Sequence, residues 1–238
     1  MNYPQKAAEE IRKLYPYRLE LHAHTSPASH CAELSNEEVL TIFKNDGYHG
    51  IGITNHFSCQ QDENIEKYSE FYRAELLKVL ELGDKIGIKV YAGAELRFIS
   101  ENDNDYLLYG YDPNDIYYIC QILRRGTLED FVKNYKTDDM LLVQAHPFRK
   151  GMVREYDRLL DGYEAFNMHP NHNSRVAVAV QYANELGKIK TMGTDFHHPN
   201  HDNLCATRAA FLPENEKELI KLIKSEDIVF EIGDKILI

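Results

Sequence analysis

Cysteine is scarce in this sequence, and its four cysteines, Cys31, Cys59, Cys120 and Cys205, include no pair spaced as C-x-x-C. That absence excludes a thiolate zinc cluster and argues against a small disulfide framework. Reduced thiols fit a reducing compartment, so we expect a cytoplasmic protein.

Long hydrophobic runs are also missing. No stretch is long enough to span a membrane. Residues 1–18 carry charges where a signal peptide would have its apolar core, at Lys6, Glu9, Glu10, Arg12 and Lys13. We therefore expect neither a secretory signal nor a membrane partner.

Positive charge is in short supply. Lysine and arginine number 27 against 38 aspartates and glutamates, which gives a formal net charge of −11. A broad surface for nucleic-acid backbone must be basic, so this balance argues against one. A small anionic substrate remains compatible, because divalent cations placed among carboxylates reverse the local field.

The sequence contains no internal repeat, low-complexity stretch or Pro/Gly-rich linker, and 43% of its 238 residues are hydrophobic. We expect one domain spanning residues 1–238, with a core large enough to fold without disulfides. Short apolar runs alternate with amphipathic segments throughout. The predicted strands are residues 17–21, 50–54, 89–94, 106–110, 141–145, 163–167, 189–193 and 228–232.

Helices are predicted between these strands. Ser35 and Glu38 have capping-box spacing for a helix that runs to about residue 45. Residues 64–86 and 174–186 read as helices, Thr127 and Asp130 give a weaker cap signal, and Pro213 suits a first helical turn. Repeated strand–helix units predict a parallel (β/α) barrel, with an open doubly wound sheet as the alternative.

Side chains that can ligate metals come directly after most of these strands. They are His22, His24, His56, Glu95, His146, Asp195 and His197. In a parallel barrel the carboxyl ends of all strands open onto one face, where barrel active sites are built. This shared placement, more than any one motif, predicts a common metal centre.

The pair His22 and His24 is weak evidence alone, because 11 histidines predict about half of one such pair by chance. On an extended segment, however, residues i and i+2 face the same side, so both imidazoles can reach one ion. Asp195 and His197 repeat that spacing after a later strand.

Each candidate also has a structural interpretation. His56 could be a hydrogen-bonded core histidine, and Glu95 could pair with Arg97 instead of a metal. His30 follows a turn-rich stretch that could fold it over the first strand end, yet a lone loop histidine is more often solvated. Arg149 is placed to hold a phosphate, with an exposed surface arginine as the alternative.

The candidate ligands are mostly histidines with a few carboxylates. Such a set suits Zn, Mn or Fe better than Mg or Ca, and it exceeds the capacity of one tetrahedral ion, so two or three divalent ions are expected. His198 and His201 are expected to face solvent or to lie behind the ligands. A serine or cysteine triad competes poorly, since no G-x-S-x-G motif is present and Cys31 and Cys59 can be passive thiols.

In this order and combination, the motifs resemble those of the PHP (polymerase and histidinol phosphatase) family of metal-dependent phosphoesterases. The resemblance covers residues 18–197 and rests on six short stretches. They are Leu21-His22-Ala23-His24-Thr25-Ser26 with His30, Ile53-Thr54-Asn55-His56, Gly93-Ala94-Glu95, Ala145-His146-Pro147-Phe148-Arg149, residues 164–167, and Gly193-Thr194-Asp195-Phe196-His197. The family implies a distorted (β/α)7 TIM-like barrel with up to three metal ions at the carboxyl ends of the strands.

Carried onto matching positions, the resemblance implies three ligand sets. They are His22, His24, Glu95 and Asp195 for one metal, Glu95 and His146 for a second, and His30, His56 and His197 for a third. The family commonly adds a histidine in or just after the fourth strand, where this sequence offers Tyr106 and Asp112. That departure leaves the ligand set of the second metal incomplete.

The chemistry implied is hydrolysis of a phosphate monoester or phosphodiester by a metal-activated hydroxide. Glu95, Asp195 and Arg149 are then the catalytic residues, with Arg149 stabilising charge on the phosphoryl oxygens and Asp195 or a water as the leaving-group acid. The expected partner is a small phosphorylated substrate or a nucleic-acid end.

Two other functions compete with this one. An amidohydrolase acting on a C–N bond would share the His-x-His motif and the late aspartate, but such enzymes commonly bridge two metals with a modified lysine where this sequence has Glu95. A non-catalytic metal-binding module is the other alternative, since the family also occurs inside polymerases.

Overall fold

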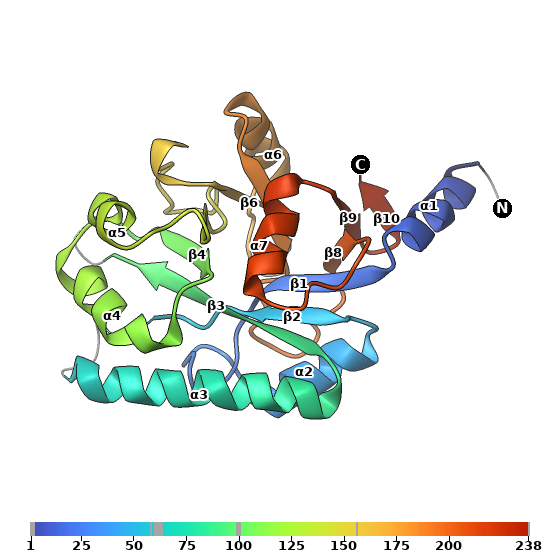
Figure 1. The fold of residues 1–238 in the computed structure, drawn as a ribbon. Helices are drawn as coiled ribbons and strands as arrows, with labels where there is room; N and C mark the ends of the chain where they lie inside the picture. Colours follow the sequence, from blue (N-terminus) through green and yellow to red (C-terminus); the bar gives the residue numbers. More distant parts are fainter. Residues whose placement is uncertain (1–2, 58, 60–63, 99–100, 156, 238) are drawn as a thin grey trace.

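The computed structural model describes residues 3–57, 59, 64–98, 101–155 and 157–237, and its centre is one curled, mixed β-sheet (Figure 1). The strand order across the sheet is β10-β9-β8-β1-β2-β3-β4-β5-β6-β7. The strands are β1 Tyr17–Ala23, β2 Gly50–Ile53, β3 Lys89–Arg97, β4 Asp105–Tyr109, β5 Leu141–Gln144, β6 Gly162–Asn167, β7 Ile189–Gly193, β8 Cys205–Ala209, β9 Ile228–Ile232 and β10 Lys235–Leu237.

Helices flank this sheet. They are α1 Tyr3–Leu14, α2 Asn36–Asn45, α3 Ile65–Ile86, α4 Ile116–Arg125, α5 Leu128–Asn134, α6 Val176–Glu185 and α7 Glu216–Ser225, with short 3₁₀ turns at Pro113–Asp115 and Asp157–Leu159. In the part of the chain that the structure describes, no helix is both long and apolar enough to cross a membrane.

The sheet curls because the chain after β7 returns to the end of β1. The amide of His24 donates to the carbonyl of Phe196 at 3.0 Å, and the amide of Phe196 donates to the carbonyl of His22 at 3.1 Å. These bonds place the ends of the first and seventh strands side by side, although β7 lies at the far end of the strand order.

The expectation of an all-parallel barrel is wrong at β4, which runs antiparallel to both β3 and β5. Only residues 98–104 join β3 to β4, and a parallel crossover needs a connection of about a dozen residues or more. The other six strands among β1–β7 pair in parallel as expected, in the two groups β1-β2-β3 and β5-β6-β7. The reversal brings the start of β4, not its end, to the edge where β3 and β5 finish.

Local signals set the helix boundaries well. Ser35 forms a full capping box with Glu38 at the start of α2, and the Asn64 side chain accepts from the amide of Lys67 at the start of α3. Gly87 ends α3 in the left-handed conformation, with φ of 80°. The helix expected at Pro213 begins later, because Asn215 provides the N-cap.

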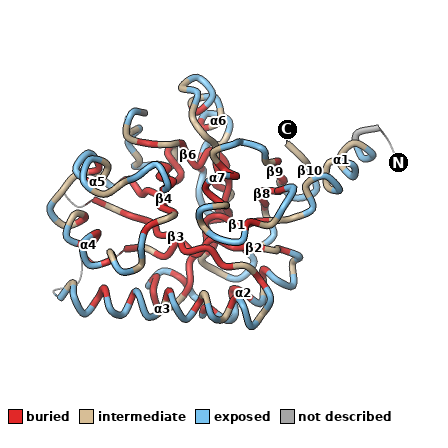
Figure 2. The backbone as a smooth tube through the Cα atoms, viewed as in Figure 1, coloured by how far each residue is buried: buried red, intermediate tan, exposed pale blue. Residues whose placement is uncertain are grey.

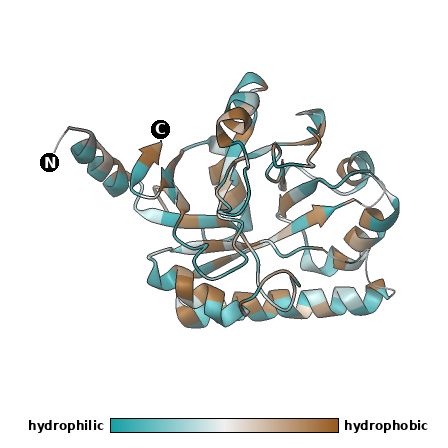
Figure 3. Cartoon of the chain, turned by 180° about the vertical axis from the view of Figure 1, so that it is seen from behind, coloured by the Kyte–Doolittle hydropathy of each residue, from teal (hydrophilic) through white to brown (hydrophobic). Residues whose placement is uncertain are grey.

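The core lies on both faces of the sheet. One cluster packs the sheet against α2, α3, α4 and α5, with Phe43, Val79, Leu123 and Phe131 among its buried members. A second cluster packs α7 against β1, β3, β4 and β5. Figure 2 shows the burial concentrated in the strands, and Figure 3 shows α3 alternating between polar and apolar positions as an amphipathic helix does.

Candidate metal centre

Two histidines and two carboxylates converge where β1, β3 and β7 meet. The Nε2 atoms of His22 and His24 lie 3.1 Å apart. Glu95 Oε2 is 3.5 Å from the first and 3.3 Å from the second, and Asp195 Oδ1 is 3.3 Å and 3.5 Å from them. Donors around a tetrahedral ion at about 2.0–2.1 Å would be separated by about 3.3 Å, which these distances match. The ligand atoms of His22, His24 and Asp195 all lie within 4.8 Å of one another, and Glu95 lies beside the two histidines.

All four residues are buried to 1% exposure or less. Two imidazole nitrogens and two carboxylate oxygens packed this closely in a buried site need protons or a cation between them to offset their desolvation. The donor set thus suits a divalent ion both by chemistry and by spacing.

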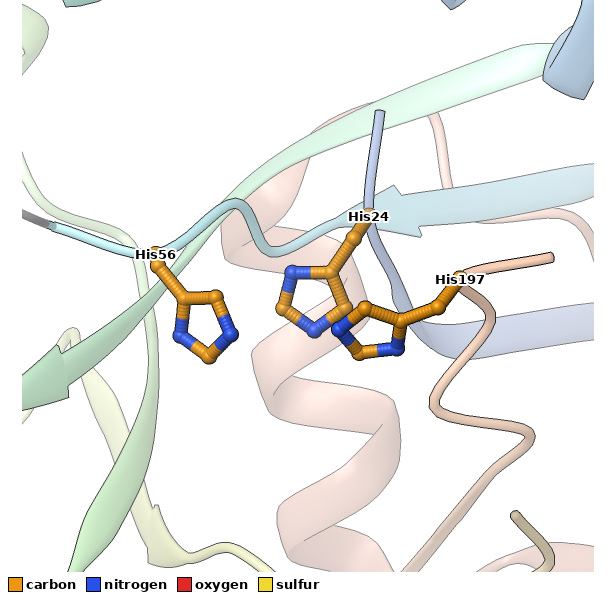
Figure 4. Close-up of side chains that lie close together, drawn as sticks. All are labelled: His24, His56 and His197. Carbon is orange, nitrogen blue, oxygen red and sulfur yellow. The ribbon is translucent and has the colours of Figure 1, made fainter. Parts of the chain in front are cut away.

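A second group joins His24 to His56 and His197 (Figure 4). One ligand atom from each lies within 4.8 Å of the others. The ring of His24 stacks on both partners, with centroids 4.5 Å from His56 and 4.2 Å from His197. His24 belongs to both groups, so the two possible ion positions are adjacent.

A third group consists of His56, Glu95 and Asp105. His146 approaches the same two carboxylates, with its Nε2 3.2 Å from Glu95 Oε1 and 3.9 Å from Asp105 Oδ2. Asp105 opens β4 and is 4% exposed. Glu95 therefore lies within 3.5 Å of four histidines, His22, His24, His56 and His146.

Glu164, on β6, holds two of the candidate ligands from behind. Its Oε1 lies 2.7 Å from His22 Nδ1, and its Oε2 accepts from the backbone amide of His146 and from Asn167 Nδ2, each at 3.0 Å. A hydrogen bond of this kind fixes the tautomer of a ligating histidine and leaves its other nitrogen free for the metal. His197 is held similarly, since its Nδ1 lies 2.8 Å from the carbonyl of Asp195.

The electrostatics of the centre favour a cation. Burial lowers the pKa of His22, but Glu164, Asp195 and Glu95 outweigh it and raise that pKa well above its usual value. Burial raises the pKa of Glu95, but His56 and His22 outweigh it and hold that pKa well below its usual value. The field that protonates these imidazoles in the absence of metal is the field that would attract a divalent ion.

His197 differs from these residues. Its burial and the neighbouring His24 lower its pKa to about 3, so the imidazole is neutral at pH 7. Neutral imidazole is the form that ligates metals.

Backbone strain marks two of the strand ends. His146 after β5 and Asp195 after β7 adopt left-handed conformations with φ of 32° and 53°. Such conformations are uncommon outside glycine and cluster at functional sites. Gly193 permits the close approach of β7, because a Cβ there would lie 2.4 Å from the Cβ of His22.

The centre opens into a cavity of about 340 Å³. Its lining residues are Cys31, His56, Glu95, Arg97, Asp105, His146, Arg149, His169, Asn171, His172, Asp195, His197 and His198. Arg149 donates from one terminal nitrogen to Asp195 Oδ2 at 2.5 Å and to Asn167 Oδ1 at 3.0 Å. A guanidinium in this position can meet an anion inside the cavity.

The structure brings together most of the residues that the sequence singled out. His22, His24, His56, Glu95, His146, Asp195 and His197 contact one another or share the cavity wall. Arg149 reaches into the cavity and is not a surface arginine. His198 pairs with Glu33 at the rim, and His201 is buried against His169.

Two candidate ligands and one alternative pairing do not fit the structure. His30 is exposed and belongs to none of the ligand groups of the described residues, whereas Cys31 from the same turn lines the cavity and interacts with His56. Arg97 pairs with Asp105 and not with Glu95. Asp112 is exposed and caps the 3₁₀ turn after β4 through the amide of Asn114.

Tyr106 also lies away from the cavity. It is buried in the main core, where its hydroxyl donates to Glu155 Oε2 at 2.9 Å. The residue of β4 that does face the candidate ligands is Asp105. The sequence reasoning missed it because ligands were sought after each strand, and an antiparallel strand presents its beginning to the site.

No family model and no curated protein matches this sequence. Solved structures do match its fold. A candidate metal-dependent phosphoesterase from Bifidobacterium adolescentis aligns with a TM-score of 0.52 at 13% identity, over 76% of this chain and 87% of that one. A two-domain protein from Bacteroides vulgatus, which contains a predicted PHP-like metal-dependent phosphoesterase, aligns with a TM-score of 0.58 at 12% identity, over 92% of this chain and 66% of that one.

An amidohydrolase from Chromobacterium violaceum, solved with bound sulfate and no metal, aligns with a TM-score of 0.56 at 14% identity, over 77% of this chain and 89% of that one. The matches to the candidate phosphoesterase and to the PHP-like two-domain protein confirm, at the level of the fold, the resemblance to the PHP family inferred from the sequence. At these identities the alignments establish the architecture and leave the reaction to be argued from the site.

Proposed function

We propose that this chain is a metal-dependent phosphoesterase that hydrolyses a phosphate monoester or phosphodiester. The observation that carries the proposal is the buried group of His22, His24 and Asp195 at the spacing of a metal site, with Glu95 beside both histidines and a cavity next to them. The motif order of the sequence and the fold of PHP-like structures support the same reading.

The ions would be held by the imidazoles and carboxylates described above, and two or three divalent ions of the Zn, Mn or Fe kind suit these donors. When bound, such ions lower the pKa of a water and withdraw charge from phosphoryl oxygens. Glu164 and Ser29 orient the ligand histidines, since Ser29 Oγ lies 3.1 Å from His24 Nδ1.

Arg149 would bind the phosphoryl group of the substrate. Its guanidinium can present two parallel donors to phosphate oxygens. Arg149 bonds Asp195 Oδ2, whereas Oδ1 is the oxygen next to His22 and His24, so an ion held through Oδ1 would leave Arg149 in place beside the substrate.

A phosphoester fits better than a C–N bond. Glu95 stands in β3 at the centre of the ligands, where a bridging lysine would be expected in the commonest amidohydrolase sites. The cavity also carries two arginines, Arg97 and Arg149, which suit an anionic substrate. We further propose that the chain forms a single domain that acts in the cytoplasm on a small phosphorylated molecule or a nucleic-acid end.

A panel of phosphate monoesters and diesters, assayed with metal-analysed protein under Mn²⁺ and Zn²⁺, tests the proposal. We expect turnover of at least one member, and loss of that turnover in His22→Ala and Asp195→Asn with circular dichroism unchanged. His49→Ala is the control, because it truncates a histidine that does not line the cavity. Full activity of metal-depleted His22→Ala would refute the assignment.

A further inference from the structure

Asp105 occupies the place at the cavity that the reversed strand β4 creates. Its carboxylate is 4% exposed and lines the cavity. Its backbone is fixed on both sides, because it pairs with Arg97 in β3 and its carbonyl accepts from the amide of Ala145 at 2.9 Å. The side chain is thus positioned by two neighbouring strands.

The geometry points to Asp105 as the third ligand of a divalent cation that Glu95 and His146 also bind. Asp105 Oδ2 lies 3.9 Å from His146 Nε2, which lies 3.2 Å from Glu95 Oε1. Neighbouring donors around a six-coordinate ion at about 2.1 Å are separated by about 3.0 Å, and wider angles give more, so both distances fit. This inference deepens the proposed function and rests on its claim that the centre holds metal.

The ion pair between Arg97 and Asp105 is the strongest argument against Asp105 as a ligand. The Nε and one terminal nitrogen of Arg97 donate to the two carboxylate oxygens of Asp105, each at 2.7 Å. A carboxylate has about four lone-pair positions, so Oδ2 can accept from Arg97 and still face an ion. Ligating carboxylates are commonly held by such outer partners. Arg97 therefore orients Asp105 and offsets part of its charge without occupying the ligand position.

The donor chemistry gives this position its own character. Two carboxylates and one imidazole form a harder set than two imidazoles with the same number of carboxylates, as at His22 and His24, and carboxylate-rich sites favour Mn²⁺ over softer ions. Asp105 replaces the histidine expected from the family near the fourth strand. We expect this ion to be the most weakly held of the centre, completed by water or phosphate.

Titration of the metal-depleted full chain with Mn²⁺ alone, followed by the electron paramagnetic resonance of free Mn²⁺, tests the assignment. Asp105→Asn and Asp105→Ala should each weaken one Mn²⁺ by at least tenfold and leave the tighter binding unchanged. Asp112→Ala is the matched control, because it removes an exposed aspartate that follows the opposite end of β4, away from the cavity, and its titration should superimpose on that of the parent. Circular dichroism of the metal-free proteins identifies any variant that fails to fold. If Asp105→Ala does not fold, the titration of the isosteric Asp105→Asn tests the assignment.

Unchanged titrations of both Asp105 variants would overturn the inference, as would loss of an ion in Asp112→Ala. A parent that binds Mn²⁺ with the expected sensitivity to Asp105, but hydrolyses no phosphoester, would support this site and refute the proposed function. A parent that binds no Mn²⁺ would refute both.

Discussion

Glu164 joins two candidate ligands from different strands through one buried carboxylate. Its two oxygens contact the ring of His22 and the backbone amide of His146. Glu164→Gln keeps the shape but replaces one acceptor with a donor, which opposes the tautomer that leaves His22 Nε2 free. We expect metal affinity to fall about 10–100-fold, the usual cost of losing such an outer partner.

Chelator competition measures this change directly, and the pH at which metal is lost should rise in the same variant. Glu185→Gln serves as the control, because Glu185 is an exposed glutamate whose Oε1 accepts from Gln181. Equal chelator midpoints for parent and Glu164→Gln would show that Glu164 only fills space.

Arg149 is the residue whose role depends most on the substrate being a phosphate. If it grips the phosphoryl group, Arg149→Ala should raise KM and the inhibition constant of inorganic phosphate by at least tenfold, and Arg149→Lys should restore only part of the loss because lysine cannot bind bidentately. Arg154→Ala is the control, since Arg154 does not line the cavity. An unchanged phosphate inhibition constant would assign Arg149 to holding Asp195 alone.

At the scale of single residues, the sequence was informative wherever a ligand follows a parallel strand. His22, Glu95, His146 and Asp195 could be named because their strands all finish at one edge. Asp105 could not, because its placement depends on strand direction, which only the length of the preceding connection indicates. Side chains such as Glu164, which act through another residue, leave no spacing signal of their own.

At the scale of elements, the end of α2 carries a pH-sensitive contact. Burial and the neighbouring Asp202 raise the pKa of Asp46, at the C-cap of α2, to about 6. The folded state therefore binds a proton more tightly than the unfolded state, whose aspartate has a pKa near 3.8. Stability from this group is full below about pH 4 and is lost as the pH rises through 6.

Asp46→Asn removes that loss, so its melting temperature should exceed that of the parent at pH 8 and approach the parent value at pH 4. Thermal unfolding across this range measures the difference. Asp202→Asn should produce a similar gain, and the double variant should add little to either. A gain of equal size at every pH would contradict the contact between the two carboxylates.

Helices and strands with strong local signals, such as capping boxes or apolar runs, were the ones predicted correctly from the sequence. Capping boxes located α2 and α5, and apolar strands such as β7 and β9 were predicted with their observed limits. The helix α4 was missed because Ile116–Arg125 is rich in β-branched and aromatic residues, which have modest helix propensity. It is helical because one of its faces packs into the main core.

At the scale of the whole molecule, β8, β9 and β10 extend the sheet beyond β1 and tie the two ends of the described chain together (Figure 1). Only β9 of this extension was predicted. The short strand β8 was missed because it has no hydrophobic alternation and pairs with β1 across a long separation in sequence. It leaves β1 hydrogen-bonded to β8 at its start and to the chain after β7 at its end. The strand β1, which carries His22, is thereby held at both of its ends.

Glu231 on β9 is the ionic centre of that extension. Its carboxylate, in a residue only 4% exposed, accepts from Arg12 of α1 and Arg208 of β8, each at 2.8 Å, and lies 3.3 Å from Arg18 of β1. Burial raises its pKa, but the bonds from Arg208 and Arg12 outweigh that effect and lower the pKa below its usual value. Stability from this group is therefore present above the unfolded pKa and is lost as the pH falls through the folded one.

Glu231→Gln would leave three arginines facing a neutral amide, and removing one partner of a buried ion pair costs about 3–5 kcal/mol. We expect the substitution to lower the free energy of unfolding, measured in urea at pH 7, by an amount near the lower end of that range, because Arg12 is partly exposed. The deficit should shrink at pH 4, where the parent begins to protonate. Asp234→Asn, an exposed carboxylate beside Arg12, should change stability little. If the two variants unfold at the same urea concentration, the extension is held by backbone pairing and packing, and the arginine cluster contributes nothing measurable.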